Sequence, residues 1–522
     1  MRVICGVTKA MEENNNVKQN MLLALNARIH QTSDDGRQHH IEKRKRKGFN
    51  SARENLALLC DTHTFQEYGQ FAVAAQRQRK DYEKLKSDTA ADGVITGIGH
   101  VNAGAFPTGQ TATAVVINDY SVLAGTQGYF HHLKLDRIID VAKQRNLPVI
   151  MFTEGGGGRP GDTDITTVNS GLQCQSFSNW AALSGVVPRI AVNNGYCFAG
   201  NAALFGSADI TIATSSSSIG MAGPAMIEGG GLGVFSPEQI GPIETQAKNG
   251  VVDIVANDEN HAIDIAKFCL SFFQGDIEHW QVSSQENIFS LLPDDRRFAY
   301  DVRQIINTLV DTNSFIELKA QYGGAIITGF CRFKGKAVGM IASNCKVLGG
   351  AIDVDAAEKC ADFLTLCQRF SLPVVSLCDT PGFMVGPEHE KLGAVRRLNR
   401  MFSVGASLNV PFIAVVLRKC YGLGAQAMLG GSTSKPDYTV SWPSGEFGAM
   451  GLEGAVKLGF KSELEQIAND EERHARFDTL LKQAYEKGQA SEVASVLEID
   501  AVIDPVKTRD IIADFFASQT VK

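Results

Sequence analysis

Several common local motifs are missing from this chain of 522 residues, which has eleven cysteines but no CxxC spacing. Its cysteines and histidines also lack zinc-finger spacing, so neither a zinc finger nor a disulfide framework is indicated. We interpret the cysteines as buried, reduced thiols. The chain has no stretch of about 18 apolar residues, and the apolar run within residues 1–6 is too short for a secretory signal. We therefore expect a cytoplasmic protein without a membrane span.

Nucleotide-binding and hydrolase motifs are missing too. No G-x-G-x-x-G follows the first strand with an acidic residue about 20 residues further on, which argues against a dinucleotide site. No G-K-[ST] is present, so a P-loop is excluded. The G-x-S-x-G motif of serine hydrolases is absent as well, so a serine hydrolase is not indicated. The chemistry must therefore rest on other features.

The charge balance argues weakly against a nucleic-acid partner, because the formal net charge is −7. Residues 39–47, HHIEKRKRK, nevertheless form a strongly basic run. We interpret this run as part of a solvated N-terminal segment. The alternative is an arm that binds a polyanion.

A long internal repeat is the most informative feature that is present. Phrases between residues 187 and 223 reappear about 225 residues later, and upstream pieces match as well. Solenoid repeats are much shorter, at roughly 20 to 50 residues, so the repeat indicates a duplicated domain. The matching segments are residues 95–97 and 327–329, 147–150 and 372–375, 187–192 and 410–415, 197–202 and 420–425, 208–212 and 436–440, and 219–223 and 447–451.

Each copy predicts alternating strands and helices. Short apolar runs at residues 114–117, 149–152 and 190–192 alternate with helical patterns such as residues 133–145. This order is typical of βαβ units with buried, largely parallel strands. The expected domains are an N-terminal extension over residues 1–60, one domain over 61–285 and a second over 286–522. The charged stretch between Asn257 and Asp301 is the expected connection.

Two peripheral segments have less specific patterns. The extension is polar with helical patches, which favours a poorly packed segment or a helix that faces a partner. After Lys461 the chain is helical and charged, with an apolar stripe that favours core or subunit packing. The stripe consists of Leu464, Ile467, Phe477, Leu480 and Leu481.

Glycines cluster where strands end. The chain has 51 glycines, about one residue in ten, against about 7% in typical proteins. Each copy has a glycine-rich turn after a strand, and about 40 residues later a second turn that opens a helix. Glycine lets the backbone approach a ligand closely, and the first amides of a helix have no partner within it. Two such turns facing one another predict an oxyanion hole made of main chain.

Side chains near these turns leave two questions open. Glu154 and Asp379 occupy equivalent positions, where each could be a general base or could cap nearby backbone amides. His131 and His132 could suggest a metal, but neighbouring helical side chains point about 100° apart. We interpret the two histidines as a solvated pair, and expect no metal site.

The same phrases resemble a known family. Residues 92–99 (DGVITGIG), 379–386 (DTPGFMVG), 418–425 (RKCYGLGA) and 497–505 (LEIDAVIDP) resemble the carboxyltransferase subunit of biotin-dependent acyl-CoA carboxylases, as do residues 51–59 (SARENLALL). The resemblance covers nearly all of the chain from about residue 48 to residue 515. It implies an α/β fold of two tandem crotonase-like (ClpP/crotonase) ββα-superhelix domains, and it is strongest with the propionyl-CoA, methylcrotonyl-CoA and longer-chain acyl-CoA branch of fatty acid metabolism.

The resemblance implies a division of labour between the halves. The N-terminal half would bind the acyl-CoA and the C-terminal half carboxybiotin, with each site completed across a dimer. The implied reaction moves a carboxyl group from carboxybiotin to an acyl-CoA through an enolate held by backbone amides. The alternative is the α subunit of a sodium-translocating acyl-CoA decarboxylase, with the same fold and the opposite direction of transfer.

Site residues follow from the match to the family's turns. The implied catalytic positions are Gly156, Gly157, Gly200 and Asn201 on the acyl side and Gly382, Leu423 and Gly424 on the biotin side. The implied binding positions are Phe198, Ala199, Arg159, Gly422, Ala425 and Gln426, with Gln426 the candidate for acyl selection. Many relatives have paired glycines where this chain has Gly200 and Asn201, and some have glycine where it has Leu423.

Missing segments bear on the partners that the resemblance implies. No Met-Lys-Met biotinylation site and no ATP-grasp segment occur, so a biotin carboxyl carrier and a biotin carboxylase are expected as separate subunits. The four-cysteine zinc ribbon of the bacterial acetyl-CoA-specific subunit is absent as well. The family also implies a hexamer built as a trimer of dimers, with no nucleic acid and no membrane partner.

Overall fold

The computed structural model describes residues 2–167 and 170–519, with side chains from residue 16 onward. The chain forms two compact units. The N-terminal unit comprises Met1–Gln246 and Val255–Leu270, and the C-terminal unit comprises Ala247–Ile254 and Ser271–Lys522. The change of unit at Leu270 falls inside the charged stretch that the sequence indicated as the connection. The domain ranges given above stay a prediction.

The N-terminal unit is built on a seven-stranded sheet with the order β1-β2-β3-β4-β5-β7-β9. Strands β1 to β3 pair antiparallel, whereas β3, β4, β5 and β7 pair parallel. The alternating pattern of the sequence is therefore confirmed. The strands are β1 Gln66–Tyr68, β2 Val94–His100, β3 Ala112–Asn118, β4 Val149–Phe152, β5 Arg189–Asn193, β7 Ile210–Thr214 and β9 Ile254–Ala256, with β6 Tyr196–Phe198 and β8 Ser218–Gly220 forming a separate parallel pair.

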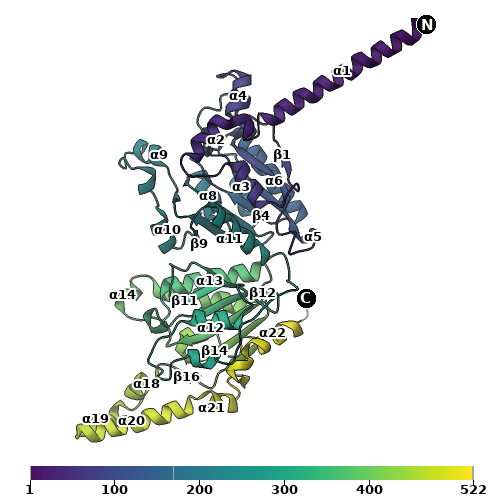
Figure 1. The fold of residues 1–522 in the computed structure, drawn as a ribbon. Coiled ribbons are helices and arrows are strands. Elements are labelled where there is room, and N and C mark those ends of the chain that lie inside the picture. The colour runs from purple at the N-terminus through teal and green to yellow at the C-terminus, as the bar shows by residue number, and fades with distance from the viewer. Residues whose placement is uncertain (1, 168–169, 520–522) are drawn as a thin grey trace. The chain divides into compact units, whose positions relative to one another are not determined.

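Helices cover this sheet. Helix α6 lies against β2 and β3, and its buried side chains include Leu135, Ile138, Ile139 and Ala142, as its periodicity predicted (Figure 1). Strand β4 is apolar and buried at every position, which is typical of a parallel strand covered on both faces. The helices are α1 Arg2–His30, α2 Gln38–Lys45, α3 Ala52–Leu59, α4 Tyr82–Asp88, α5 Thr108–Thr111, α6 Tyr129–Arg145, α7 Ser176–Ala181, α8 Gly200–Gly206, α9 Pro224–Gly229, α10 Ile243–Lys248 and α11 Glu259–Ser271.

The C-terminal unit repeats the plan with the sheet order β10-β11-β12-β13-β14-β15-β17, to which β16 adds beside β14. Its parallel core of β12, β13, β14 and β15 corresponds to β3, β4, β5 and β7. The strands are β10 Ile316–Leu318, β11 Ile326–Phe333, β12 Lys336–Ser343, β13 Val374–Thr380, β14 Phe412–Tyr421, β15 Tyr438–Ser441, β16 Glu446–Gly448 and β17 Ala501–Val502. The helices are α12 Val302–Leu309, α13 Val354–Arg369, α14 Pro387–Glu390, α15 Ala394–Leu398, α16 Arg400–Ser407, α17 Gly422–Met428, α18 Leu452–Gly459, α19 Lys461–Gln466, α20 Asp470–Lys487, α21 Ala490–Ser495 and α22 Thr508–Ser518.

The duplication extends to a buried lysine in each unit. Lys134 on α6 donates to the carbonyl oxygens of Ala91 and Val94. Lys359 on α13 donates to the carbonyl oxygens of Lys319 and Tyr322, at 2.9 and 3.1 Å. Burial lowers the pKa of each lysine to about 8. Each ammonium group therefore ties a turn to the main helix, at a cost in desolvation.

This burial predicts a pH dependence of stability. The pKa of Lys359 falls from 10.5 to about 8 on folding, so the unfolded chain holds this proton more tightly. Its contribution to the free energy of unfolding should therefore rise between pH 8 and 10.5, by about 3 kcal/mol in total. We expect the difference in free energy of unfolding between wild type and Lys359→Met, measured by urea denaturation, to grow across this range in favour of wild type. Lys487→Met, a change at an exposed position, is the control, and equal pH profiles for both variants would contradict the prediction.

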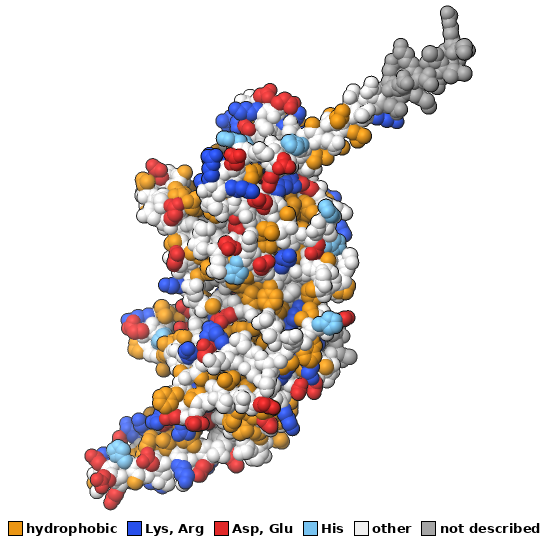
Figure 2. Space-filling model, viewed as in Figure 1, with side chains coloured by type: hydrophobic (Ala, Val, Ile, Leu, Met, Phe, Trp, Pro, Cys, Tyr) orange, Lys and Arg blue, Asp and Glu red, His pale blue; other side chains and the backbone are white. Residues whose placement is uncertain are grey.

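The apolar stripe near the C-terminus packs within the C-terminal unit. Leu464 and Leu480 form a small buried cluster with Val456, against which Phe477 and Leu481 pack. Figure 2 shows acidic and basic side chains mixed over α19 and α20, which carry this cluster. The stripe is therefore core packing of helices α18 to α20.

The N-terminal extension is only partly as expected. Ile41 is buried, and Arg37 forms a buried ion pair with Asp119 at 2.7 Å. The expectation of a poorly packed segment is thus wrong from about residue 37 onward, because α2 and α3 pack on the N-terminal unit. The last turns of α1 differ, since Met21, Leu22 and Leu23 are 60% exposed or more.

Candidate functional site: paired glycine turns

The first glycine turn of the N-terminal unit follows β4 and pairs with β6. Gly155 donates to the carbonyl oxygen of Tyr196 at 2.7 Å, and Phe198 donates to that of Gly155 at 3.0 Å. Two residues further on, a Cβ added to Gly157 would lie 2.8 Å from the Cβ of Ala199. The absence of a side chain at Gly157 therefore lets this turn contact the start of α8. The predicted pairing of the two turns is present in this unit.

The residue before α8 has a strained backbone. Ala199 has φ 51° and ψ −119°, a combination that residues with a Cβ rarely adopt. In the second copy the equivalent residue is Gly422, with φ 58°. Strain of this kind persists where the surrounding structure enforces it, and it clusters at functional sites.

The turns of the C-terminal unit approach one another even more closely. A Cβ added to Gly424 in α17 would lie 2.5 Å from the carbonyl carbon of Gly382 and 2.7 Å from the nitrogen of Phe383. Both contacts are to backbone atoms, which cannot rotate away as a side chain can. Leu423, by contrast, is 62% exposed, and Gln426 is exposed as well. The first turn of α17 is therefore accessible in this unit.

Several amides of the predicted site already have partners inside the protein. Gly156 donates to the carbonyl oxygen of Ala124 at 3.0 Å, and Gly157 donates to Oδ1 of Asn201 at 3.0 Å. Gly382 donates to Oγ1 of Thr380 at 3.1 Å. The helix starts differ, because the first amides of α8 and α17 have no carbonyl one turn earlier in their own helix. Gly200 and Leu423 are thus the best-placed donors among the predicted residues.

The two carboxylates after the strands are held in ion pairs. Glu154 lies 2.5 Å from Nη2 of Arg44, and Asp379 lies 3.1 Å from Nε of Arg418, all four side chains being buried. Asp379 also accepts a hydrogen bond from the backbone amide of Lys419 at 3.1 Å. Burial raises the pKa of Glu154 in spite of Arg44, but one oxygen of each carboxylate is held by its arginine. The geometry supports a structural role for both.

The nearest thiol is not a nucleophile either. Cys197 lies in β6, two residues before Ala199, and is fully buried. Burial raises the pKa of its thiol to about 12, so the thiolate is scarce at neutral pH. Cys197 therefore does not supply a nucleophile to these turns.

Arg159 does not point into the site. Its guanidinium forms an ion pair with Asp92 and donates to the carbonyl oxygen of Thr126 at 2.8 Å, and the side chain is 3% exposed. These contacts brace the turn that carries Gly156 and Gly157. The placement supports a structural role rather than the predicted binding role.

The interpretation of the two histidines as a solvated pair is wrong. His131 is 1% exposed, and burial lowers the pKa of its ring well below the usual range. His132 contacts Oγ of Ser176 at 3.0 Å and Sγ of Cys174 at 3.3 Å. Helix α6 has neighbours on two sides, the sheet and α7, so adjacent residues are both covered.

The basic run lines a cavity that the sequence did not predict. A cavity of about 450 Å³ lies between α2 and the segments that lead to the turns. Figure 2 shows basic side chains over α2. Only part of the run is solvated, because Arg44 is buried against Glu154. The lining residues are His40, Lys43, Arg44, Lys47, Phe49, Tyr120, Ser121, Ala124, Glu154, Gly195, Tyr196, Ser216 and Glu238.

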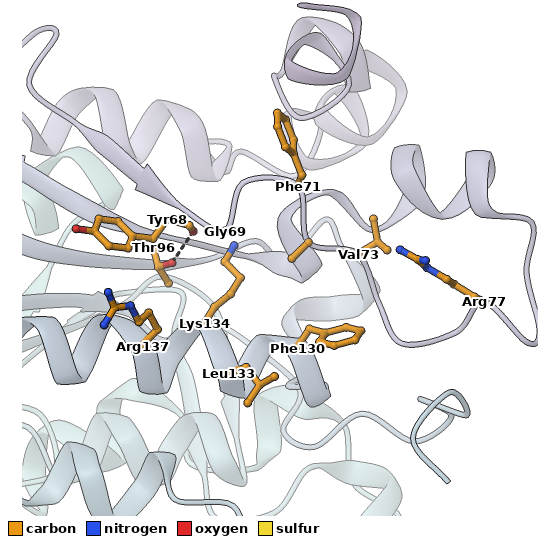
Figure 3. A pocket seen from close by; sticks show the side chains of 11 residues that line it. Tyr68, Gly69, Phe71, Val73, Arg77, Thr96, Phe130, Leu133, Lys134 and Arg137 are labelled. Carbon is orange, nitrogen blue, oxygen red and sulfur yellow. Dashed lines mark hydrogen bonds between the residues drawn. The ribbon is translucent and has the colours of Figure 1, made fainter. Parts of the chain in front are cut away.

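A second cavity lies away from the turns. Its volume is about 410 Å³, and Figure 3 shows Phe71, Phe130 and Leu133 around it, with Thr96 bonded to the carbonyl oxygen of Tyr68. Lys134 borders it, but its ammonium group is already held by Ala91 and Val94. No predicted site residue lines this cavity.

Neither a metal site nor a membrane span occurs among the residues that the structure describes. Within those residues, no group of three histidine, cysteine, aspartate or glutamate side chains could hold a metal ion. Nor does any helix among them combine the length and apolar character needed to cross a membrane.

Comparisons with known proteins agree with the geometry. Residues 43–522 match the carboxyl transferase domain family. The chain is 31% identical over 519 residues to the methylmalonyl-CoA carboxyltransferase 12S subunit of Propionibacterium freudenreichii subsp. shermanii, covering 96% of each chain. A crystal structure of transcarboxylase 12S, described as a hexamer with methylmalonyl-CoA bound, superposes with a TM-score of 0.84 at 29% identity, covering 96% of this chain and 95% of that one.

A larger solved protein is more similar in sequence. The structure of a single-chain, multi-domain long-chain acyl-CoA carboxylase is 48% identical, with a TM-score of 0.89 over 95% of this chain. This chain spans about half of that protein, 48% of its length. The tandem crotonase-like fold and the resemblance inferred from the sequence are confirmed. The chain therefore belongs to the carboxyl transferase domain family of enzymes.

Proposed function

We propose that this chain transfers a carboxyl group from carboxybiotin, held on a separate carrier protein, to an acyl-CoA. The observation that carries the proposal is the duplicated pair of glycine turns in a chain that matches the carboxyl transferase domain over residues 43–522. Carboxyl transfer develops negative charge on two oxygens, that of the thioester and that of the ureido ring. Two sets of backbone donors suit this requirement.

The chain's own contribution is to hold and polarise both reactants. Carboxybiotin, when bound, would supply the carboxyl group, and its ureido nitrogen, once that group has left, would accept the substrate proton. The amides of Gly200 and Asn201 would donate to the thioester oxygen, and those of Leu423 and Gly424 to the ureido oxygen. Ala199 and Gly422 set the backbone direction through their positive φ. Phe198 and Ala425 flank the turns and are buried.

The basic cavity is a suitable place for the CoA part of the substrate. Lys43 and Lys47 are exposed and line it together with His40, and Tyr120 offers an aromatic face. Glu154, which also lines the cavity, directly precedes the glycine turn of residues 155–158. Phosphate groups bind cationic side chains through charge-assisted hydrogen bonds. A CoA bound there would direct its thioester toward Gly200.

An apolar acyl chain is the substrate that we favour. Met221, Met226 and Leu232 are between 65% and 75% exposed. They follow β8, which pairs with β6 immediately before the turn at Ala199. The relative with 48% identity is described as a long-chain acyl-CoA carboxylase. We assign Gln426, which is exposed on α17 after the turn proposed for biotin, to selection among acyl groups.

The assembly follows the relatives. The transcarboxylase 12S structure is described as a hexamer, and the single-chain relative contains further domains beyond the part matched here. We propose a hexamer of this chain that works with a biotin carboxylase and a biotin carboxyl carrier protein. In such a trimer of dimers, the N-terminal half of one subunit would complete an active site with the C-terminal half of another subunit.

The experiment is a transfer assay with a panel of acyl-CoA thioesters from two to sixteen carbons, biotin carboxylase, carrier protein, ATP and bicarbonate. We expect carboxylation of apolar acyl-CoAs. Changing Lys43 and Lys47 together to Ala should raise KM for acyl-CoA by about 10-fold, because two phosphate contacts are lost. It should not raise KM for the matching pantetheine thioester. Lys45→Ala is the control, since Lys45 pairs with Glu54 at 2.7 Å and does not line the cavity.

The outcomes separate the alternatives. Carboxylation that requires ATP and biotin carboxylase supports the proposal. Transfer only from a carboxyacyl-CoA to the carrier, with none in the forward direction, would favour the decarboxylase α subunit. Absence of transfer in both directions with every thioester would refute the function.

A further inference from the structure

Gln127 occupies a position that the second copy fills with an apolar side chain. Gln127 donates its amide to the carbonyl oxygen of Gly157 at 2.8 Å, and Arg159 donates to the carbonyl oxygen of Gln127 at 2.8 Å. Ile352 donates to Gly382 at 3.0 Å and accepts from Met384 at 2.8 Å. The two backbones are therefore equivalent, 225 residues apart. The side chains are 3% and 0% exposed.

A buried glutamine without a partner is unfavourable here. Nε2 of Gln127 has no hydrogen-bond partner among the described residues. An amide that is removed from water and left unbonded reduces the stability of the folded state, whereas the isoleucine of the second copy incurs no such cost. Packing alone therefore does not explain a glutamine at this position.

The side chain borders the turn where we place the acyl thioester. A Cβ added to Gly200 would lie 2.2 Å from Oε1 of Gln127 and 3.0 Å from Cζ of Phe177. The carboxamide thus lies directly beside Gly200, in the space that a side chain at this position would occupy. A half-turn of the carboxamide exchanges Oε1 and Nε2, so the amino group can reach the same space.

Neighbouring donors of the first turn are occupied. The amides of Gly156 and Gly157 donate to Ala124 and to Oδ1 of Asn201, both at 3.0 Å. A hydrogen bond to the thioester oxygen beyond those of the α8 amides of Gly200 and Asn201 must therefore come from another group. The carboxamide of Gln127 is buried, adjacent and carries an unbonded N–H.

We propose that Gln127 is a catalytic residue whose Nε2 donates a hydrogen bond to the oxygen of the acyl thioester at Gly200. The hydrogen bond strengthens as negative charge develops on that oxygen, so it stabilises the enolate more than the bound thioester. The inference rests on the proposed function and adds a side-chain donor to backbone donors. The C-terminal unit, with Ile352, lacks this donor.

The test compares Gln127→Met with Gln76→Met in the assembled hexamer. Methionine keeps the length of the side chain and removes the donor. Loss of one such donor typically lowers kcat by about 10²- to 10³-fold, and KM for acyl-CoA should change by less than about threefold. Tm should stay equal or rise, because an unbonded buried amide is removed. Gln76 is also buried, but its Nε2 donates to Asp162 at 3.1 Å, so Gln76→Met should lower Tm and largely retain kcat.

A second variant gives a signature that a structural role would not produce. In Gln127→Glu the side chain donates only while its carboxyl is protonated. We expect kcat of this variant to rise as pH falls, relative to wild type measured at the same pH. A flat ratio across pH 5.5–8.5 would count against the proposal.

The outcomes are distinguishable from failure of the proposed function. An active wild type with Gln127→Met within threefold of its kcat overturns the role of Gln127 alone. A loss of kcat that parallels a loss of Tm assigns Gln127 to folding and also overturns it. A wild type inactive on every thioester removes the proposed function, and this inference with it.

Discussion

Gly424→Ala should reduce carboxyl transfer by at least about 10²-fold while the protein remains folded. The added Cβ would lie 2.5 Å from the carbonyl carbon of Gly382 and 2.7 Å from its Cα, so the two turns must separate. A shift of about 1 Å in a catalytic group can cost about 10²-fold in rate. The φ of Gly424 is not positive, so alanine suits the backbone and, in a helix, favours folding.

The measurement is kcat/KM for acyl-CoA, with thermal unfolding followed on the same samples. Gly454→Ala in α18 is the matched control, because its Cβ would meet only the flexible end of Met450, at 3.5 Å. This control should keep full activity and gain up to about 1 kcal/mol in stability. Activity of Gly424→Ala within threefold of wild type would remove the close approach of the turns from the mechanism.

Asp379→Ala should destabilise the C-terminal unit by about 3 to 5 kcal/mol. The side chains of Asp379 and Arg418 are 0% and 4% exposed, so the change leaves the guanidinium of Arg418 buried without its partner. Breaking a buried pair from one side is far more costly than losing a surface pair. For a unit of about 250 residues, this corresponds to a fall in Tm of roughly 10 °C.

Two comparisons isolate the cause. The double change Asp379→Ala with Arg418→Met should recover part of the lost Tm, because no unpaired charge remains. Glu388→Ala removes an exposed partner of Lys391 and should change stability by less than about 0.5 kcal/mol. If Asp379→Ala melts at the same temperature as Glu388→Ala, the ion pair does not contribute as we infer.

The sequence by itself determined the fold plan of this protein. The offset of about 225 residues, the apolar runs of β3, β4 and β5, and the periodicity of α6 predicted two α/β copies, which the structure contains. The glycine turns could be located because strands and helices depend on local pattern, and turns follow where that pattern stops. The segments that resemble the carboxyltransferase family indicated the reaction class, because they are local sequence motifs that can be recognised without the tertiary structure.

Only the tertiary structure decided which side chains meet. Arg44 pairs with Glu154 across 110 residues, so a run that looked solvated supplies a buried ion pair and one wall of a cavity. His131 is buried, and Arg159 faces Asp92 rather than a ligand. Contacts between distant segments depend on how sheets and helices pack, and periodicity does not encode that packing.

Gln127 is a residue whose proposed role could not be predicted from the sequence. In the sequence it is one polar residue near a glycine, with no motif to mark it. Its equivalence to Ile352 follows from matching backbone hydrogen bonds. Only packing shows that its carboxamide lies beside Gly200 with Nε2 unbonded. The repeat predicted two equivalent copies, but only the tertiary structure shows that one copy buries an amide where the other buries a hydrocarbon, because the free-energy cost of a polar group depends on its surroundings.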